Sequence, residues 1–79
     1  MFEPKKRTAT IDGQEVVVRQ LTLEDTNRVE EDADMAEVVA LSWDSPGNVT
    51  AEQVRKWPTS VVKEIYELCL DLNGYNEGN

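Results

Sequence analysis

The sequence predicts a small, mostly helical α+β domain in which an N-terminal two-stranded β-hairpin packs on three α-helices. Three observations predict this fold: an Asp-Gly pair between two strand-like runs, two helix-start signals, and an apolar stripe at helical spacing near the C-terminus. A chain of 79 residues has room for one hydrophobic core. We therefore expect residues 1–79 to form a single domain, with flexible ends at residues 1–6 and 75–79.

The hairpin is predicted from Asp12-Gly13, which lies between Thr8–Ile11 and Gln14–Arg19. Asp-Gly favours the type I′ turn, because that turn needs positive φ at both central residues. A two-residue loop places Ile11 opposite Gln14, and the strand period of two then sorts the side chains onto two faces. The apolar face carries Ile11, Ala9, Val16 and Val18. An isolated hairpin is marginal in water, so the helices must cover this face.

The first helix is predicted from Leu23 to Ser42. Thr22 is a suitable N-cap, Asp25 completes a capping box, and Glu24 adds negative charge where the helix dipole favours it. Crowded carboxylates weaken the first half of this helix: Glu30, Glu31, Asp32 and Asp34. We therefore expect that half to be mobile, or the helix to bend or break near residues 26–33.

A loop at Trp43–Val49, marked by Pro-Gly, separates this helix from two further helices. Thr50, with Gln53 three residues on, predicts a capping box for a short helix over residues 51–56. Pro58 disfavours helical geometry at the residue before it and suits the first position of the third helix. Gly74 suits the left-handed position after that helix.

The third helix is the densest apolar segment of the chain, and its apolar stripe is wide. Two neighbours, or one neighbour and a partner protein, must therefore cover it. Over all elements, we expect the core to include Ile11, Val16, Val18, Leu21, Val39, Leu41, Val54, Ile65, Leu68, Cys69 and Leu72.

Charge and composition exclude several classes of function. The net charge is −8, and residues 23–49 alone carry eight acidic and one basic side chain. Such a segment repels nucleic acid. The first residues do not resemble a signal peptide, and no apolar run is long enough to cross a membrane. The one cysteine cannot form a disulfide within the chain, so a reducing cytoplasm is the expected compartment.

The residues do not predict an enzyme, a cofactor site or a metal site. The chain has no histidine to activate Cys69 or a hydroxyl group. Asp32 and Asp34 could open a calcium loop, but Ala36 takes a ligand position and Glu37 takes the place of the turn glycine. We interpret the acidic cluster as a solvated face or a docking surface for a basic partner.

Two tryptophans, Trp43 and Trp57, lie at helix boundaries beside turn residues. Tryptophan is enriched in the hot spots of protein interfaces. The alternative is that each closes one end of the core and donates its N–H to a nearby carbonyl. As candidate partner-binding residues we take Trp43, Trp57, Val62, Tyr66 and Leu70, the last three from the third helix.

Several segments, in this order, resemble the small tail assembly chaperones of long-tailed phages and prophages. They are the V-x-V-R-x-L-T run Val16–Thr22, the VALS run Val39–Ser42, the T-x-E-Q-V start Thr50–Val54, the hinge Trp57-Pro58 and the ending Ile65–Gly74. The resemblance extends from about Thr8 to Asn76 and rests on pattern and order, without a catalytic motif.

The resemblance implies a non-enzymatic protein that binds the tape measure protein and keeps it soluble while tail tube subunits assemble. It implies a host-cytoplasmic protein that is absent from the mature virion, and contact with the tail tube protein through a longer, frameshifted form. The loop at Trp43–Val49 is shorter than in many relatives, and the chain ends soon after Leu72-Asn73-Gly74.

Two other classes of function fit the composition. An acidic mimic of DNA would use the charge of residues 23–49 to block a basic protein, although its carboxylates would be spread over an extended face. A small adaptor or antitoxin would insert the apolar third helix into one partner. Self-association would also widen the narrow margin of stability of so small a chain.

Overall fold

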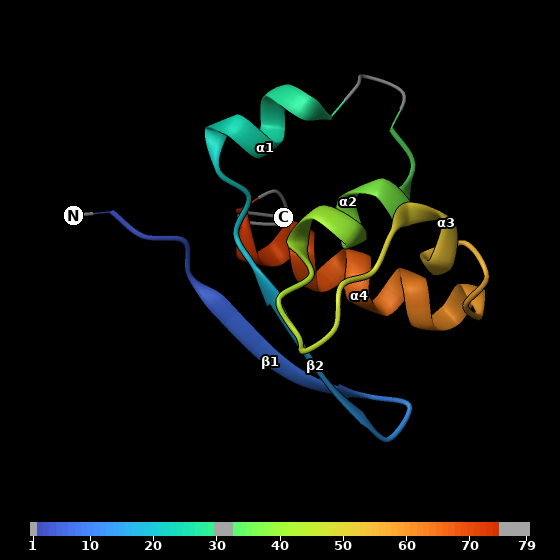
Figure 1. Cartoon of the computed structure of the whole chain (residues 1–79). Helices are drawn as coiled ribbons and strands as arrows, with labels where there is room; N and C mark the ends of the chain where they lie inside the picture. Colours follow the sequence, from blue (N-terminus) through green and yellow to red (C-terminus); the bar gives the residue numbers. More distant parts are fainter. Residues whose placement is uncertain (1, 30–32, 75–79) are drawn as a thin grey trace.

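The computed structural model of this chain describes residues 2–29 and 33–74 and confirms the α+β fold class. Along the chain the elements are β1 (Lys6–Ile11), β2 (Gln14–Arg19), α1 (Leu23–Arg28), α2 (Met35–Ser42), α3 (Ala51–Val54) and α4 (Thr59–Leu72). The hairpin crosses beneath α4 and α2, and α1 lies on the far side of these helices from the hairpin turn (Figure 1). No helix among the described residues is long and apolar enough to span a membrane.

The hairpin has the predicted turn and register. Asp12 and Gly13 both have positive φ, at 51° and 79°, as the type I′ turn requires. Ile11 pairs with Gln14, and the antiparallel ladder continues without a bulge to Lys6 and Arg19. Pairing reaches into the predicted flexible N-terminus, since Lys5 and Gln20 also exchange hydrogen bonds.

The start of the Trp43–Val49 loop pairs with the outer edge of β2. Val18 and Trp43 form an antiparallel bridge, and the Asp44 N–H donates to the Val17 carbonyl at 2.9 Å. The Val17 N–H in turn donates to Ser45 Oγ at 2.6 Å. The backbone N–H and carbonyl of Val17, on the outer edge of β2, are therefore paired with a segment that the sequence predicted to be a loop.

The predicted first helix is broken, and the described residues contain four helices where three were expected. α1 ends at Arg28 and α2 begins at Met35 with Asp34 as its N-cap. The break falls in the expected region, while Glu30, Glu31 and Asp32 lie outside the described residues. Asp34 begins a new helix as its N-cap, because its carboxylate accepts a hydrogen bond from the Glu37 N–H at 3.1 Å.

The other helix ends differ little from the predictions. The capping box of Thr50 and Gln53 is formed, although α3 ends at Val54, two residues early. Pro58 is the N-cap of α4 with an extended ψ of 139°, not its first helical residue. Gly74 has a φ of 83°, as predicted for the position after the helix. The predicted flexible tail at residues 75–79 lies outside the described residues, as does Met1.

The core joins the hairpin to α2, α3 and α4. Its predicted members that are buried are Ile11, Val16, Val18, Val39, Val54, Ile65 and Cys69, and Ala36 and Val62 complete it. Leu68 and Leu72 are half-buried and pack against it.

The prediction that Leu21 and Leu41 belong to the core was wrong, because both are half-buried and lie outside it. Residues two apart on a helix point about 200° apart, so the burial of Val39 turns Leu41 away from the core. Leu21 follows the end of β2, and its side chain lines a groove described below.

Candidate partner-binding surface

α4 is covered along its middle and presents two different flanks. Its buried line consists of Val62, Ile65 and Cys69. Because each residue turns the helix by about 100°, Tyr66 and Leu70 fall on one flank and Val61 and Leu68 on the other. Of the candidate residues on α4, Tyr66 and Leu70 therefore lie on the same flank.

The prediction that Val62 belongs to a partner-binding surface was wrong, because Val62 is buried. Its exposed fraction is 9%, and it belongs to the core cluster. The apolar stripe on α4 is wide enough that the sequence alone did not distinguish its centre from its margin. α2 packs against this centre and makes Val62 a core residue.

Trp43 and Trp57 meet although they are far apart in sequence. Their ring centroids are 5.4 Å apart, and the ring planes are tilted by 55°. The Trp43 Nε1–H donates to the Gly47 carbonyl at 2.9 Å, which is the contact predicted for a tryptophan that closes the core. The two tryptophans also line an open cleft of about 270 Å³, which we call the Trp cleft. Its lining residues are Ile11, Asp12, Gln14, Val16, Trp43, Trp57, Pro58, Val61 and Ile65.

Tyr66 and Leu70 line a second cavity of about 290 Å³, which we call the α1 groove. It lies between α1, α2 and α4, and its other lining residues are Leu21, Thr26, Val29 and Val38. Five of the six side chains are apolar or aromatic. Tyr66 and Leu70 are both half-buried, and the sequence did not predict the wall that α1 provides beside them.

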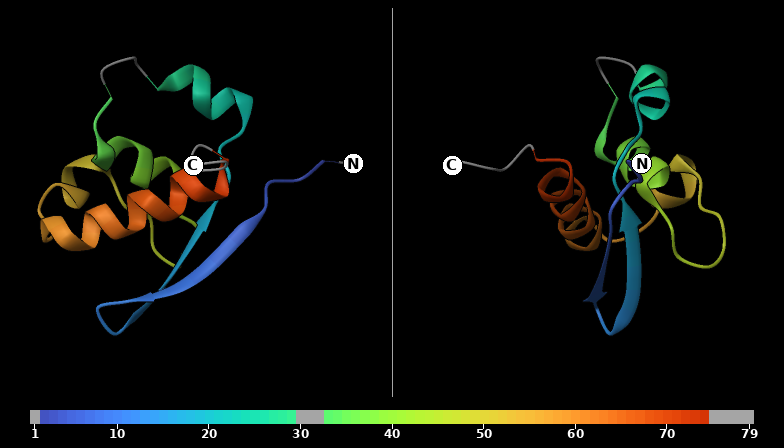
Figure 2. Two further views of the ribbon diagram at one scale, coloured as in Figure 1. Left: turned by 180° about the vertical axis from the view of Figure 1, so that it is seen from behind. Right: turned by 90° about the vertical axis from the view of Figure 1, so that its left-hand side faces the viewer.

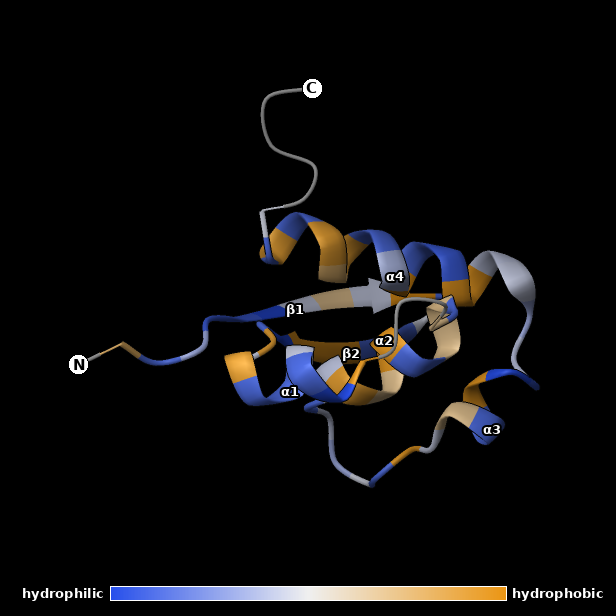
Figure 3. Ribbon diagram, turned by 90° about the horizontal axis from the view of Figure 1, so that it is seen from above, coloured by the Kyte–Doolittle hydropathy of each residue, from blue (hydrophilic) through white to orange (hydrophobic). Residues whose placement is uncertain are grey.

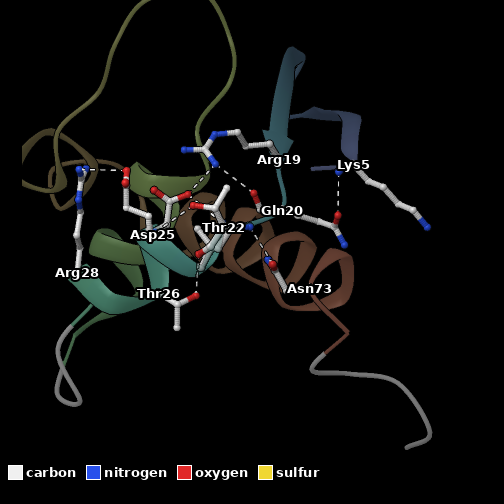
Figure 4. Close-up of polar contacts among 10 residues, drawn as sticks. Lys5, Arg19, Gln20, Thr22, Asp25, Thr26, Arg28 and Asn73 are labelled. Carbon is white, nitrogen blue, oxygen red and sulfur yellow. Dashed lines mark hydrogen bonds and ion pairs between the residues drawn. The ribbon is translucent and has the colours of Figure 1, made fainter. Parts of the chain in front are cut away.

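Polar contacts at its first turn hold α1 in place (Figure 4). The Asp25 N–H donates to Thr22 Oγ1 at 3.1 Å, and the Thr22 N–H donates to Asp25 Oδ2 at 3.0 Å, which completes the predicted capping box. The same carboxylate oxygen accepts a hydrogen bond from Arg19 Nη1 at 2.8 Å. The hydrogen bond from the Arg19 guanidinium is the largest cause that lowers the pKa of Asp25 from 3.8 to about 2. The capping contacts with Thr22 lower the pKa further, while burial of the carboxylate opposes this shift.

The entry to α1 is fixed to the end of α4. The Leu21 N–H donates to Asn73 Oδ1 at 2.9 Å, and Asn73 Nδ2 donates to the Cys69 carbonyl at 2.7 Å. Gln20 Nε2 donates to the Leu72 carbonyl at 3.0 Å. One end of the α1 groove is therefore built on a fixed junction between β2 and α4, part of which is drawn in Figure 4.

The acidic cluster is partly neutralised where the structure describes it. Arg55 Nε donates to Asp34 Oδ2 at 2.9 Å, and Arg55 Nη2 lies 3.4 Å from Glu37 Oε1. Arg55 accordingly lowers the pKa of Asp34, and Asp34 raises that of Arg55. Within residues 2–29 and 33–74, no three potential metal-ligating side chains come together.

Cys69 is fully buried in the core. Burial raises the pKa of its thiol, and the neighbouring Ser42 hydroxyl only partly offsets this effect. A protonated, inaccessible thiol is a packing group and a poor nucleophile.

The chain matches no protein-family model, no curated protein and no solved structure. The functional conclusion therefore depends on the segment order in the sequence and on the surface described above.

Proposed function

We propose that this protein is a non-enzymatic phage tail assembly chaperone that binds the tape measure protein and keeps it soluble during tail tube assembly. The segments from Val16 to Gly74 that resemble this family support the proposal. In this proposal the tail tube protein is an indirect partner, reached through a longer frameshifted form, and the chaperone acts in the host cytoplasm and leaves before the virion is mature.

The observation that carries the proposal is the apolar α1 groove beside α4. A helix docking with its apolar stripe needs a groove lined by aliphatic and aromatic side chains. Tyr66 and Leu70 provide one wall of such a groove, and Val29 and Val38 line it as well. In this proposal the client is the tape measure protein, a long helical chain that exposes an apolar stripe of this kind until the tail tube encloses it.

The charge of the chain supports the same role. Residues 23–49, which contribute α1 and α2, carry a net charge of −7. Bound copies would surround an apolar client with negative charge, and like-charged complexes repel one another. Solubilisation thus requires only binding, without ATP or a catalytic group.

Co-expression tests the proposal. The cognate tape measure protein is expressed with the wild-type chain or without it, and the soluble fraction of the client is measured. We expect the wild type to raise the soluble fraction and Leu70→Gln to lose most of that gain. An equal soluble fraction with and without the wild-type chain contradicts the proposal.

Leu23→Gln is the matched control. Leu23 is 77% exposed on α1 and does not line the α1 groove. The control removes the same apolar side chain and leaves the groove unchanged, so it should preserve solubilisation. Loss of solubilisation in both variants would show that general surface hydrophobicity, and not the groove, is responsible.

A further inference from the structure

The outer edge of β1 is open to another strand. In an antiparallel pair, alternate residues direct their N–H and C=O groups toward the partner strand. The Gln20 N–H donates to the Lys5 carbonyl, so the same alternation turns Arg7 and Ala9 toward β2. The backbone groups of Lys6, Thr8 and Thr10 then point outward. The sheet of the described residues has only two strands, and nothing in them pairs with this edge.

This edge lacks the usual devices that prevent strand addition. β1 is six residues long, contains no proline and pairs with β2 without a bulge. Lys6 does not guard the edge, because its Nζ forms an ion pair with Asp44 Oδ2 at 3.0 Å. Asp44 belongs to the segment that pairs with the opposite edge of the hairpin.

A groove of about 370 Å³ lies along this edge between β1 and α4. We call it the β1–α4 groove, and its lining residues are Ala9, Thr10, Ile11, Glu64, Glu67, Leu68 and Asp71. Figure 3 and the right-hand view of Figure 2 show α4 on the β1 side of the hairpin. A strand added to β1 would therefore lie beneath α4, with alternate side chains facing that helix.

The α4 side of the groove is acidic. Arg7 Nη1 pairs with Asp71 Oδ2 at 2.6 Å, so one of the three carboxylates is neutralised by the strand itself. Within residues 2–29 and 33–74, Glu64 and Glu67 have no ion-pair partner. Ala9 and Leu68 give the floor between them an aliphatic surface.

We propose that β1 accepts an extended segment of a partner protein, added as an antiparallel third strand, with lysine or arginine at two positions two residues apart. The open backbone groups of Lys6, Thr8 and Thr10 select a β-strand. Residues of the added strand opposite Ala9 and Ile11 face α4, where Glu64 and Glu67 attract cations and Leu68 packs on aliphatic stems. This interaction does not depend on the α1 groove and goes beyond the proposed function.

A second copy of this chain fits the same edge poorly. Antiparallel pairing of two β1 strands relates the copies by a twofold axis perpendicular to the sheet. Each α4 overlies the position of the added strand, so the two helices would occupy the same space on one face. The occupant is therefore a segment that has no helix packed on it in this way.

The probe is the acetylated and amidated hexapeptide Thr-Lys-Thr-Lys-Thr-Val, titrated into the isotopically labelled full chain. We expect amide shifts at Thr8 and Thr10 and slower hydrogen exchange of these two N–H groups. A peptide with proline in place of the central threonine has the same charge but cannot complete the ladder, and it should not bind. Equal binding of both peptides, or shifts confined to the Trp cleft or the α1 groove, would overturn the proposal.

Charge removal provides the second measurement. The double variant Glu64→Gln, Glu67→Gln should weaken peptide binding about fivefold, the size expected for two surface ion pairs. Glu3→Gln, Glu52→Gln is the matched control, since it removes the same charge from exposed residues outside the groove and should change binding by less than about twofold. Equal weakening in both variants would show that the peptide is attracted to overall charge alone, which would overturn the proposal.

The oligomeric state of the free chain is the third measurement. If light scattering gives the mass of a dimer and the Thr8 N–H is protected from hydrogen exchange, the edge is occupied by a second copy, and the proposal is overturned.

Discussion

Substitution of Asp25 by alanine should release α1 while the rest of the fold remains. The Asp25 carboxylate is the only side chain that joins the Thr22 N–H to the Arg19 guanidinium in the described structure, at 3.0 and 2.8 Å. Loss of a helix-capping contact costs about 1 kcal/mol. Loss of the ion pair adds about 1 kcal/mol, because Arg19 is 26% exposed and water can replace its partner.

The pKa of Asp25 gives an independent value for the same interaction. A fall from 3.8 to about 2 corresponds to about 2 kcal/mol that favours the folded, ionised carboxylate. Solvent around Arg19 reduces this figure to about 1–2 kcal/mol. The contacts therefore give about 2 kcal/mol for the attachment of α1, at the upper end of the range of about 1–2 kcal/mol that the pKa gives.

Hydrogen exchange measured residue by residue is the assay. In Asp25→Ala, exchange of amides in residues 23–29 should accelerate by about 30-fold, the factor that corresponds to 2 kcal/mol. Amides of Ile65 and Cys69, in the core, should change much less. Thr50→Ala is the control, since it removes a capping box that has no ion pair. Uniform acceleration across α4 in Asp25→Ala would refute the view that α1 is held separately.

The same carboxylate sets a pH dependence. Because the folded pKa of Asp25 is lowered, its contribution is complete above about pH 4 and is lost as pH falls toward 2. The difference in unfolding free energy between the wild type and Asp25→Asn should therefore shrink from about 2 kcal/mol at pH 6 to about zero below pH 2. A difference that stays constant over this range would exclude the ion pair as its source.

Three further substitutions test the junction between β2 and α4, the hairpin turn and the core. Asn73→Ala removes the hydrogen bond from the Leu21 N–H and the one from Asn73 Nδ2 to the Cys69 carbonyl, and urea unfolding should show a loss of about 1–2 kcal/mol. Gly13→Ala meets no atom within 4 Å but must adopt a φ of 79°, so backbone strain alone should lower Tm by an amount equivalent to about 1 kcal/mol. Val39→Ala opens a cavity at a fully buried site, and chemical unfolding should show a loss of about 2–3 kcal/mol; a loss below about 1 kcal/mol would mean that the core collapses around it.

Local signals predicted the local elements well. Asp12-Gly13 determined the turn and hence every pair in the hairpin, because a two-residue loop leaves one register. Thr22 and Thr50 predicted two helix starts, since a capping box involves only residues three apart. The apolar stripe predicted α4, but its width hid which side chains a neighbour would cover, and Val62 was misplaced for that reason.

Contacts between distant residues could not be predicted in this way. Trp43 was expected in a loop, yet it pairs with Val18 and packs its ring at a tilt against that of Trp57. Asp25 was predicted as a capping acid, while its second role as the partner of Arg19 needs the bend between β2 and α1. The α1 groove likewise exists only because the first helix breaks and α1 folds back over Tyr66.

The segment that carries α1 lies between two parts of the chain that are held in place. Before α1, the Leu21 N–H is bonded to Asn73; after α1, the buried Ala36 and Val39 pack α2 into the core. The hairpin and α4 therefore hold their positions whatever the length of α1. Under the proposed function, insertions, deletions or exchange of α1 would therefore alter which client is recognised, at little cost to foldability. Replacing the α1 segment of this chain would then be a direct way to change client preference while the hairpin and α4 stay constant.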